Sequence, residues 1–232
     1  MKIEHEGGSQ EFSKQRTWGR LGETGSWSID IALDRTPLDA LANTWAQRFI
    51  EKFLVAFEPL CFPEQIQYES VHIDDAGRIL DERDERISFD SSGKPGSAHF
   101  ASTLQVPEPW VMTTAFVRCS TMVTLPGLDR GLSTERVPDS AECYLGYVLD
   151  SDDKEGTRIH SCRIAFETSV DAWVRKTLDP ETWMWRDNTA VAECNQLRLA
   201  SALRAWEQAI GSPITEWVSR YYPDQISRFG FL

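Results

Sequence analysis

Residues 141–149, AECYLGYVL, and residues 157–168, TRIHSCRIAFET, flank the polar loop DSDDKEG at 150–156. Large apolar residues alternate with other types from Cys143 to Leu149, which is the two-residue period of a strand with one buried face. A polar loop rich in Asp and closed by Gly156 is typical of a chain reversal. The stretch therefore predicts an antiparallel hairpin, and the rest of the chain is interpreted around it.

More strand patterns precede this hairpin, and the first of them is the alternation between Trp27 and Leu33. Further candidate strands are 65–73, 86–90, 98–106 and 110–125, separated by pieces rich in Gly, Pro, Asp and Ser. Consecutive strands without helices between them favour an antiparallel sheet over a parallel one. The predicted fold class is α+β: an antiparallel meander sheet of about six or seven strands, one long N-terminal helix and a C-terminal helical segment.

The long N-terminal helix has a clear start at Thr36-Pro37-Leu38-Asp39. Threonine is a good N-cap, proline fits the first helical position, and an acid follows three residues after the cap. We expect this helix to end near Glu58, before Pro59. The C-terminal segment is predicted to hold a short helix after Thr168, a longer one over 189–210 that ends at Gly211, and another over 212–218.

No linker, repeat or low-complexity segment divides the 232 residues, so a single domain is predicted. Within it, 1–25 is expected to be irregular, apart from a short edge strand near 12–18. Residues 27–168 are expected to hold the first helix and the sheet, and 169–232 to be helical.

Composition narrows the class of protein. With 41% hydrophobic and 26% charged residues, the chain has the make-up of an ordinary globular protein. The five cysteines are widely spaced and include no C-x-x-C pair, which argues against a disulfide framework and against a zinc site. The chain begins without the apolar run of a signal peptide, and no window approaches 18 uninterrupted apolar residues, so a cytoplasmic protein without a membrane association is expected.

The net charge of −12 opposes direct binding to nucleic acid, because no locally basic run compensates for it. The acidity suits solubility or docking onto a basic partner.

Familiar catalytic signatures are missing from the sequence. It holds no phosphate-binding loop, no G-x-S-x-G elbow and no H-E-x-x-H helix. His160 and Cys162 are two residues apart on a predicted strand and would face the same side, where a thiolate or metal site is conceivable, although buried packing residues are the simpler interpretation. We therefore predict no catalytic residue, no metal ligand and no cofactor.

Two acidic clusters are candidates for partner binding. The first comprises Asp81, Glu82, Asp84 and Glu85. The second, in the hairpin loop, comprises Asp150, Asp152, Asp153 and Glu155. Each is interpreted either as a charged strand edge or loop exposed to solvent, or as a surface that meets a basic partner. The spacing in the second cluster does not fit a calcium-binding loop, because Gly156 stands seventh rather than sixth.

The chain has nine tryptophans, and the segment Trp183-Met184-Trp185 is the unusual one. It lies in a connection after Pro180, where three large side chains in succession cannot all point inward from a helix. Exposed aromatic residues beside an arginine, here Arg186, are typical of interface hot spots, so Trp183 and Trp185 are predicted partner-binding residues. A loop that plugs the end of the sheet is the alternative.

These features resemble the immunity proteins that bacteria encode beside polymorphic or contact-delivered toxins. The resemblance lies in acidic composition, α+β architecture and the aromatic segments Trp27, Trp183–Trp185 and Tyr221-Tyr222-Pro223. It implies an inhibitor that binds and neutralises a cognate toxin, which is often a basic nuclease. The alternatives are an enzyme of another family and a small-molecule binding protein that uses the face of the sheet.

Overall fold

The computed structural model describes residues 18–58, 60–75, 78–89, 106, 109–127, 131–152 and 156–232, with the side chains of 34–42, 150–152 and 156 excepted. The strands expected at 12–18 and 98–106 lie outside the described residues, except for Trp18 and Val106, and these two are not in a strand.

A seven-stranded sheet forms the body of the fold, in the order β3-β2-β4-β5-β6-β1-β9, and every neighbouring pair is antiparallel. Its strands are β1 (Arg20–Pro37), β2 (Cys61–Ile73), β3 (Ile79–Ser88), β4 (Trp110–Pro126), β5 (Leu132–Asp152), β6 (Gly156–Val170) and β9 (Glu216–Val218). The predicted α+β class with an antiparallel sheet is confirmed. The order is a meander only in part, because β1 pairs with β6 and β3 lies outside β2.

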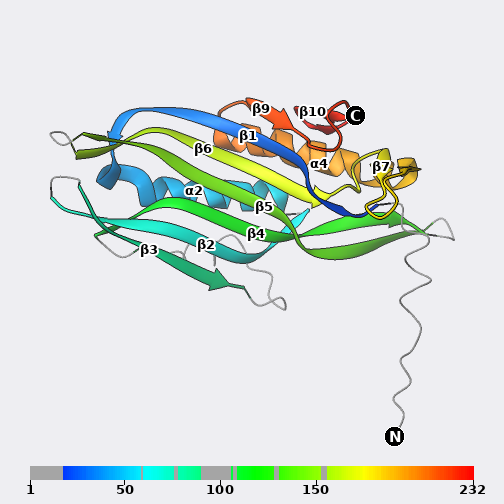
Figure 1. The fold of residues 1–232 in the computed structure, drawn as a ribbon, viewed down its shortest axis with the longest axis horizontal. Coiled ribbons are helices and arrows are strands. Elements are labelled where there is room, and N and C mark those ends of the chain that lie inside the picture. Colours follow the sequence, from blue (N-terminus) through cyan, green and yellow to red (C-terminus); the bar gives the residue numbers. More distant parts are fainter. Residues whose placement is uncertain are drawn as a thin grey trace, which may run out of the picture.

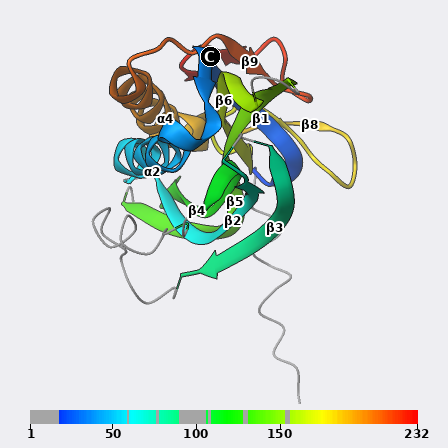
Figure 2. The same ribbon diagram turned by 90° about the vertical axis from the view of Figure 1, so that its left-hand side faces the viewer.

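Two long helices cover one face of the sheet, α2 (Leu38–Phe57) and α4 (Thr189–Ile210). Figure 1 shows the strands crossing in front of both helices, and Figure 2 shows α4 above α2, both to the left of the curved sheet. The two helices have 20 and 22 residues, so the prediction of one long N-terminal helix was incomplete. Helix α4 has the predicted bounds and ends at Gly211, whose φ of 81° is left-handed and whose N–H bonds the carbonyl of Glu207.

The prediction that 169–232 is helical was wrong outside α4. This segment also contains β7 (Lys176–Leu178), β8 (Trp185–Asp187), β9, β10 (Ile226–Ser227) and β11 (Gly230–Phe231). The short helix expected after Thr168 is a turn, in which the amide of Val174 bonds the carbonyl of Asp171 at 3.0 Å. The helix expected over 212–218 is replaced by a strand because the amide of Thr215 bonds Ser28 of β1 at 2.8 Å and β9 then pairs with β1.

The first 25 residues were expected to be irregular, but Arg20 to Gly25 belong to β1. Arg20 pairs with Val170 and Gly25 with Thr168, so the long strand β6 orders this glycine-rich segment. The acidic stretch around Asp84 is likewise a strand, because β3 pairs along most of β2. A strand partner therefore decides both segments, the distant strand β6 for the first and the neighbouring strand β2 for the second.

Cross-strand neighbours divide the sheet into an apolar face and a polar face. One row across six strands places side chains toward the helices: Trp27, Phe166, Cys143, Val117, Ile66 and Ile87. The first five of these are buried, and Phe166 stacks on Phe57 of α2 with ring centroids 4.3 Å apart. The next row along the strands faces away from the helices: Ser26, Glu167, Glu142, Arg118, Gln65 and Ser88.

Two asparagines attach the helices to opposite ends of β4. Where β5 does not yet pair with β4, Asn43 of α2 donates to the carbonyl of Trp110 at 3.0 Å and accepts from the amide of Met112 at 2.7 Å. Where β2 has ended, Asn195 of α4 accepts from the amide of Thr124 at 2.8 Å and donates to its carbonyl at 2.7 Å. Each side chain thus replaces a missing strand neighbour and satisfies backbone groups that would otherwise lack a partner.

Candidate functional site

The first predicted acidic cluster lies on the edge strand β3 and is divided between the two faces of the sheet. Asp81 and Glu85 are opposite His72 and Tyr68 of β2. Tyr68 donates its hydroxyl hydrogen to Glu85, and Arg83 forms an ion pair with the same carboxylate at 2.9 Å. Glu82 and Asp84 point to the other face and are exposed. The four acids therefore do not form one surface.

The second predicted cluster cannot be placed as a set. Asp150 and Asp152 belong to the end of β5, but their side chains are outside the described residues. Asp153 and Glu155 lie outside the described residues altogether.

Trp183, Met184 and Trp185 lie at the turn between β7 and β8, and we call them the tryptophan turn. Their side chains are 63%, 65% and 58% exposed, whereas Trp27, Trp173 and Trp206 are fully buried. Figure 2 shows the β7–β8 hairpin reaching out on the side of the sheet away from α2 and α4. The tryptophan turn is therefore a projecting apolar knob and does not plug the end of the sheet.

Asp179 holds the tryptophan turn in shape. Its buried carboxylate accepts hydrogen bonds from the amides of Glu181 and Thr182, both at 2.8 Å, and forms an ion pair with Arg186. Its backbone closes the turn, because its carbonyl accepts from the amide of Trp183 and its amide donates to the carbonyl of Met184. An aspartate that bonds amides two and three residues ahead is a common way to fix a turn.

A buried tyrosine supports the turn from below. The ring of Trp185 lies edge-on to that of Tyr222, with centroids 6.1 Å apart. The Tyr222 hydroxyl donates to the carboxylate of Asp171 at 3.0 Å and accepts from the amide of Leu178 at 3.1 Å. The underside of Trp185 is therefore packed against a fixed group, and its exposed surface faces outward.

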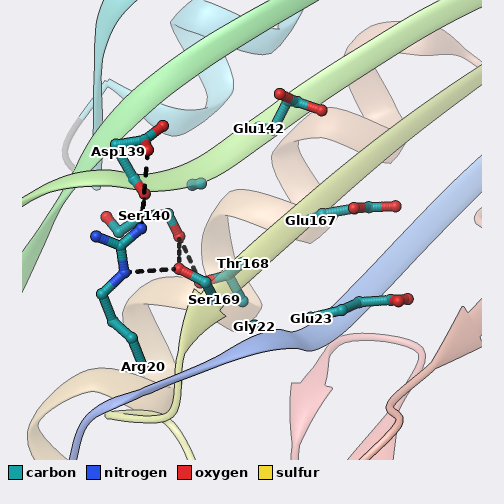
Figure 3. A pocket seen from close by; sticks show the side chains of 10 residues that line it. Arg20, Gly22, Glu23, Asp139, Ser140, Glu142, Glu167, Thr168 and Ser169 are labelled. Atoms are coloured by element: carbon teal, nitrogen blue, oxygen red, sulfur yellow. Dashed lines mark hydrogen bonds and ion pairs between the residues drawn. The ribbon is translucent and has the colours of Figure 1, made fainter.

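Three glutamates form a second feature near the turn, and we call Glu23, Glu142 and Glu167 the carboxylate row. Glu142 of β5 and Glu167 of β6 are direct cross-strand neighbours on the polar face. Figure 3 shows the three side chains, from β5, β6 and β1, extending side by side in one direction. Like charges directly opposite each other on a sheet are destabilising, so the row is electrostatically unfavourable unless a cation meets it.

The positive charges close to the row compensate it only partly. Arg118, opposite Glu142, brings its Nε within 3.4 Å of that carboxylate. Arg20 points away from the row, and its guanidinium donates to the carbonyls of Pro138 and Asp139 and to the hydroxyl of Ser169 (Figure 3). Arg20 and the row line a shallow hollow of about 220 Å³ on the polar face.

The surroundings of Glu142 and Glu167 raise the pKa of both carboxyl groups. Burial raises the pKa of Glu142 above its ordinary value, and the nearby Arg118 opposes this shift. Burial, followed by the negative charges of Glu23 and Glu142, raises the pKa of Glu167. Both shifts show that the ionised forms are held under unfavourable conditions.

Sequence reasoning missed the carboxylate row. Glu142 and Glu167 stand at polar positions of the predicted hairpin, so it was predictable that these two side chains share a face of the sheet. Their pairing was not, because the register between β5 and β6 shifts between Val148 and Leu149, opposite His160.

The same irregularity corrects the expectation for His160 and Cys162. His160 is exposed and Cys162 is fully buried, so the two side chains do not share a face as a regular strand would require. Within the described parts of the chain, no group of three or more His, Cys, Asp or Glu residues is placed to hold a metal ion. Cys61, Cys119 and Cys143 are also buried and free, and burial raises the pKa of Cys61 and Cys162 to about 12.

Two findings concern the chain as a whole. No helix among the described residues is both long enough and apolar enough to cross a membrane. The chain matches no protein-family model, no curated protein and no solved structure.

Proposed function

We propose that this protein functions by binding a basic protein, and that it is an inhibitor of the immunity type that neutralises a cognate toxin. The observation that carries the proposal is the tryptophan turn, an exposed and firmly held apolar knob. Large aromatic side chains dominate the binding energy of many protein interfaces, because their burial removes much apolar surface from water at a small cost in conformational entropy.

Charge supports the same proposal. The chain carries a net charge of −12, and the carboxylate row concentrates negative charge at the end of β6 from which the chain continues into the β7–β8 hairpin. A basic partner would be attracted at long range and would relieve the repulsion within the row. The turn would then slow dissociation through its apolar contacts.

A second candidate function rests on the pair Glu142 and Glu167. Carboxyl groups with a raised pKa beside a hollow are what a general acid requires, so acid–base catalysis on a small polar substrate is the alternative. The catalytic alternative predicts a reaction that needs no cosubstrate. The rate of this reaction should fall by orders of magnitude in the variant Glu167→Gln and should not depend on the tryptophan turn. A small-molecule ligand on the polar face without turnover would likewise depend on the row alone.

The proposal is tested by capture of partners with the purified chain in extracts of its own cells. We expect one basic protein at a 1:1 ratio, released by salt, and lost when the bait carries Trp183→Ser and Trp185→Ser. Both residues are exposed, so the double variant should retain its fold. Capture that is unaffected by the double variant would count against the proposal.

A further inference from the structure

We infer that the partner is contacted in the corner between the β7–β8 hairpin and the carboxylate row, and that this corner takes a basic amphipathic segment, with Lys or Arg on one side and large apolar residues on the other. The inference deepens the proposed function by naming the chemistry of the partner's contacting segment. It rests on the proposal that the protein binds a basic protein.

The corner arises from the path of the chain. β6 carries Glu167 on the polar face and ends at Val170, and Lys176 then begins the hairpin, which Figure 2 shows reaching away from the helices. The row lies on the sheet surface and the tryptophan turn projects beside the same end of the sheet. A ligand in the corner thus meets carboxylates on one side and an apolar knob on the other.

The apolar side of the corner is formed before any partner arrives. Trp183 has a φ of 55°, a left-handed conformation that is strained for a bulky residue. Asp179 maintains it through two amide hydrogen bonds and the ion pair to Arg186. A strained conformation that is maintained this firmly and exposes aromatic surface points to a functional contact. Binding of a partner would therefore carry no entropic cost for ordering the turn.

The tryptophan turn cannot bury itself against its own protein. The space beneath Trp185 is filled by Tyr222, whose hydroxyl is fixed by Asp171 and by the amide of Leu178. Each exposed aromatic side chain presents a large apolar surface to water, and the free energy of burying that surface is favourable. A complementary apolar side chain from a partner is what would recover this energy.

The acidic side of the corner selects a cation. Arg20 is committed to two backbone carbonyls and Ser169, which leaves Arg118 as the guanidinium paired with the row. An added guanidinium or ammonium group would stabilise the ionised forms of Glu142 and Glu167. A nucleic-acid backbone or an anionic membrane would be repelled by the same carboxylates, so a basic polypeptide is the occupant that the charges favour.

The test uses a synthetic 18-residue helical peptide of Lys and Leu arranged with one charged and one apolar side, titrated into the full chain by isothermal calorimetry. We expect saturable 1:1 binding that weakens with salt. A peptide with the same lysines but Gln in place of Leu should bind at least tenfold more weakly, because it cannot use the tryptophan turn.

Two variants and one matched control locate the site. Trp183→Ser with Trp185→Ser, and the triple variant Glu23→Gln, Glu142→Gln, Glu167→Gln, should each weaken binding at least tenfold. The control triple Glu69→Gln, Glu82→Gln, Asp84→Asn removes the same charge from exposed acids of β2 and β3, which lie on the same polar face but toward the opposite edge of the sheet, and should change affinity less than twofold.

The inference is overturned if the control triple weakens binding as much as the row variant, if the tryptophan variant binds normally, or if vesicles of phosphatidylcholine and phosphatidylglycerol bind more tightly than the peptide. Its failure is separable from failure of the proposed function, because a cognate toxin could still be captured through another surface. Conversely, if the peptide binds but no toxic partner is found, the corner is supported as a binding site and the immunity function is contradicted.

Discussion

Replacing Asn195 by alanine tests how α4 is attached to the sheet. Asn195 is fully buried, and its side chain bonds both the amide and the carbonyl of Thr124, at 2.8 and 2.7 Å. Alanine would leave these two backbone groups without that partner. An unsatisfied buried polar group costs about 1–3 kcal/mol, so the two together cost about 2–6 kcal/mol. The better helix propensity of alanine returns about 0.5 kcal/mol, and a net loss of about 2–5 kcal/mol is expected.

Urea unfolding followed by circular dichroism measures this loss. The midpoint should fall while the dependence on urea stays constant, because the surface exposed on unfolding hardly changes. Leu197→Ala is the matched control on the same helix, since Leu197 is 76% exposed, and it should cost less than about 0.5 kcal/mol. A loss below about 1 kcal/mol for Asn195→Ala, or an equal loss in the control, would refute the role assigned to this side chain.

Three further predictions concern acidity, thiols and the turn. Because burial raises the pKa of Glu142 and of Glu167 in the folded state, that state binds protons at these two groups more tightly, and their contribution to stability should fall as the pH rises from about 4.5. Glu167→Gln should therefore raise the melting temperature at pH 7 and have no effect well below pH 4.5, and a variant less stable at pH 7 would contradict this. Of the five thiols, half-buried Cys194 should react first with dithiobis(nitrobenzoate) at pH 8, and uniform fast reaction would argue against the packed core. Asp179→Ala should speed tryptic cleavage at Arg186. Asp179→Asn should not, because its side chain keeps an oxygen that accepts from the amides of Glu181 and Thr182. Equal cleavage of both variants would show that Asp179 does not fix the turn.

Elements that are determined by residues close together in the sequence could be predicted from it. The bounds of α4 follow from its apolar periodicity and from Gly211, and α2 begins at Leu38, one residue after the predicted proline. The hairpin of β5 and β6 follows from alternation on both sides of a polar loop. In each case, the residues that decide the structure are close together in sequence.

Elements decided by distant partners could not be predicted in this way. Residues 212–218 carry a good helix start, yet hydrogen bonds to Ser28 make β9 a strand. The role of Asn43 could not be predicted either, because nothing local shows that β5 leaves part of β4 unpaired.

The candidate site shows the same division between local and distant information. Trp183 and Trp185 were singled out because three large residues follow one another in a connection, and both are exposed. The carboxylate row depends on strand register and on the path of β1, neither of which is written in a local pattern. The acids of β3, which are contiguous in sequence, are instead separated onto two faces.

The central claim, that this protein neutralises a toxic basic partner through the corner, is tested most directly by growth rescue. The protein encoded next to this chain is expressed in a sensitive host together with the wild-type chain, the tryptophan variant, the row variant or the control triple on β2 and β3. We expect growth with the wild type and with the control triple, and arrest with the tryptophan and row variants at equal expression. Arrest with the wild type, or equal rescue by all four chains, would contradict the account.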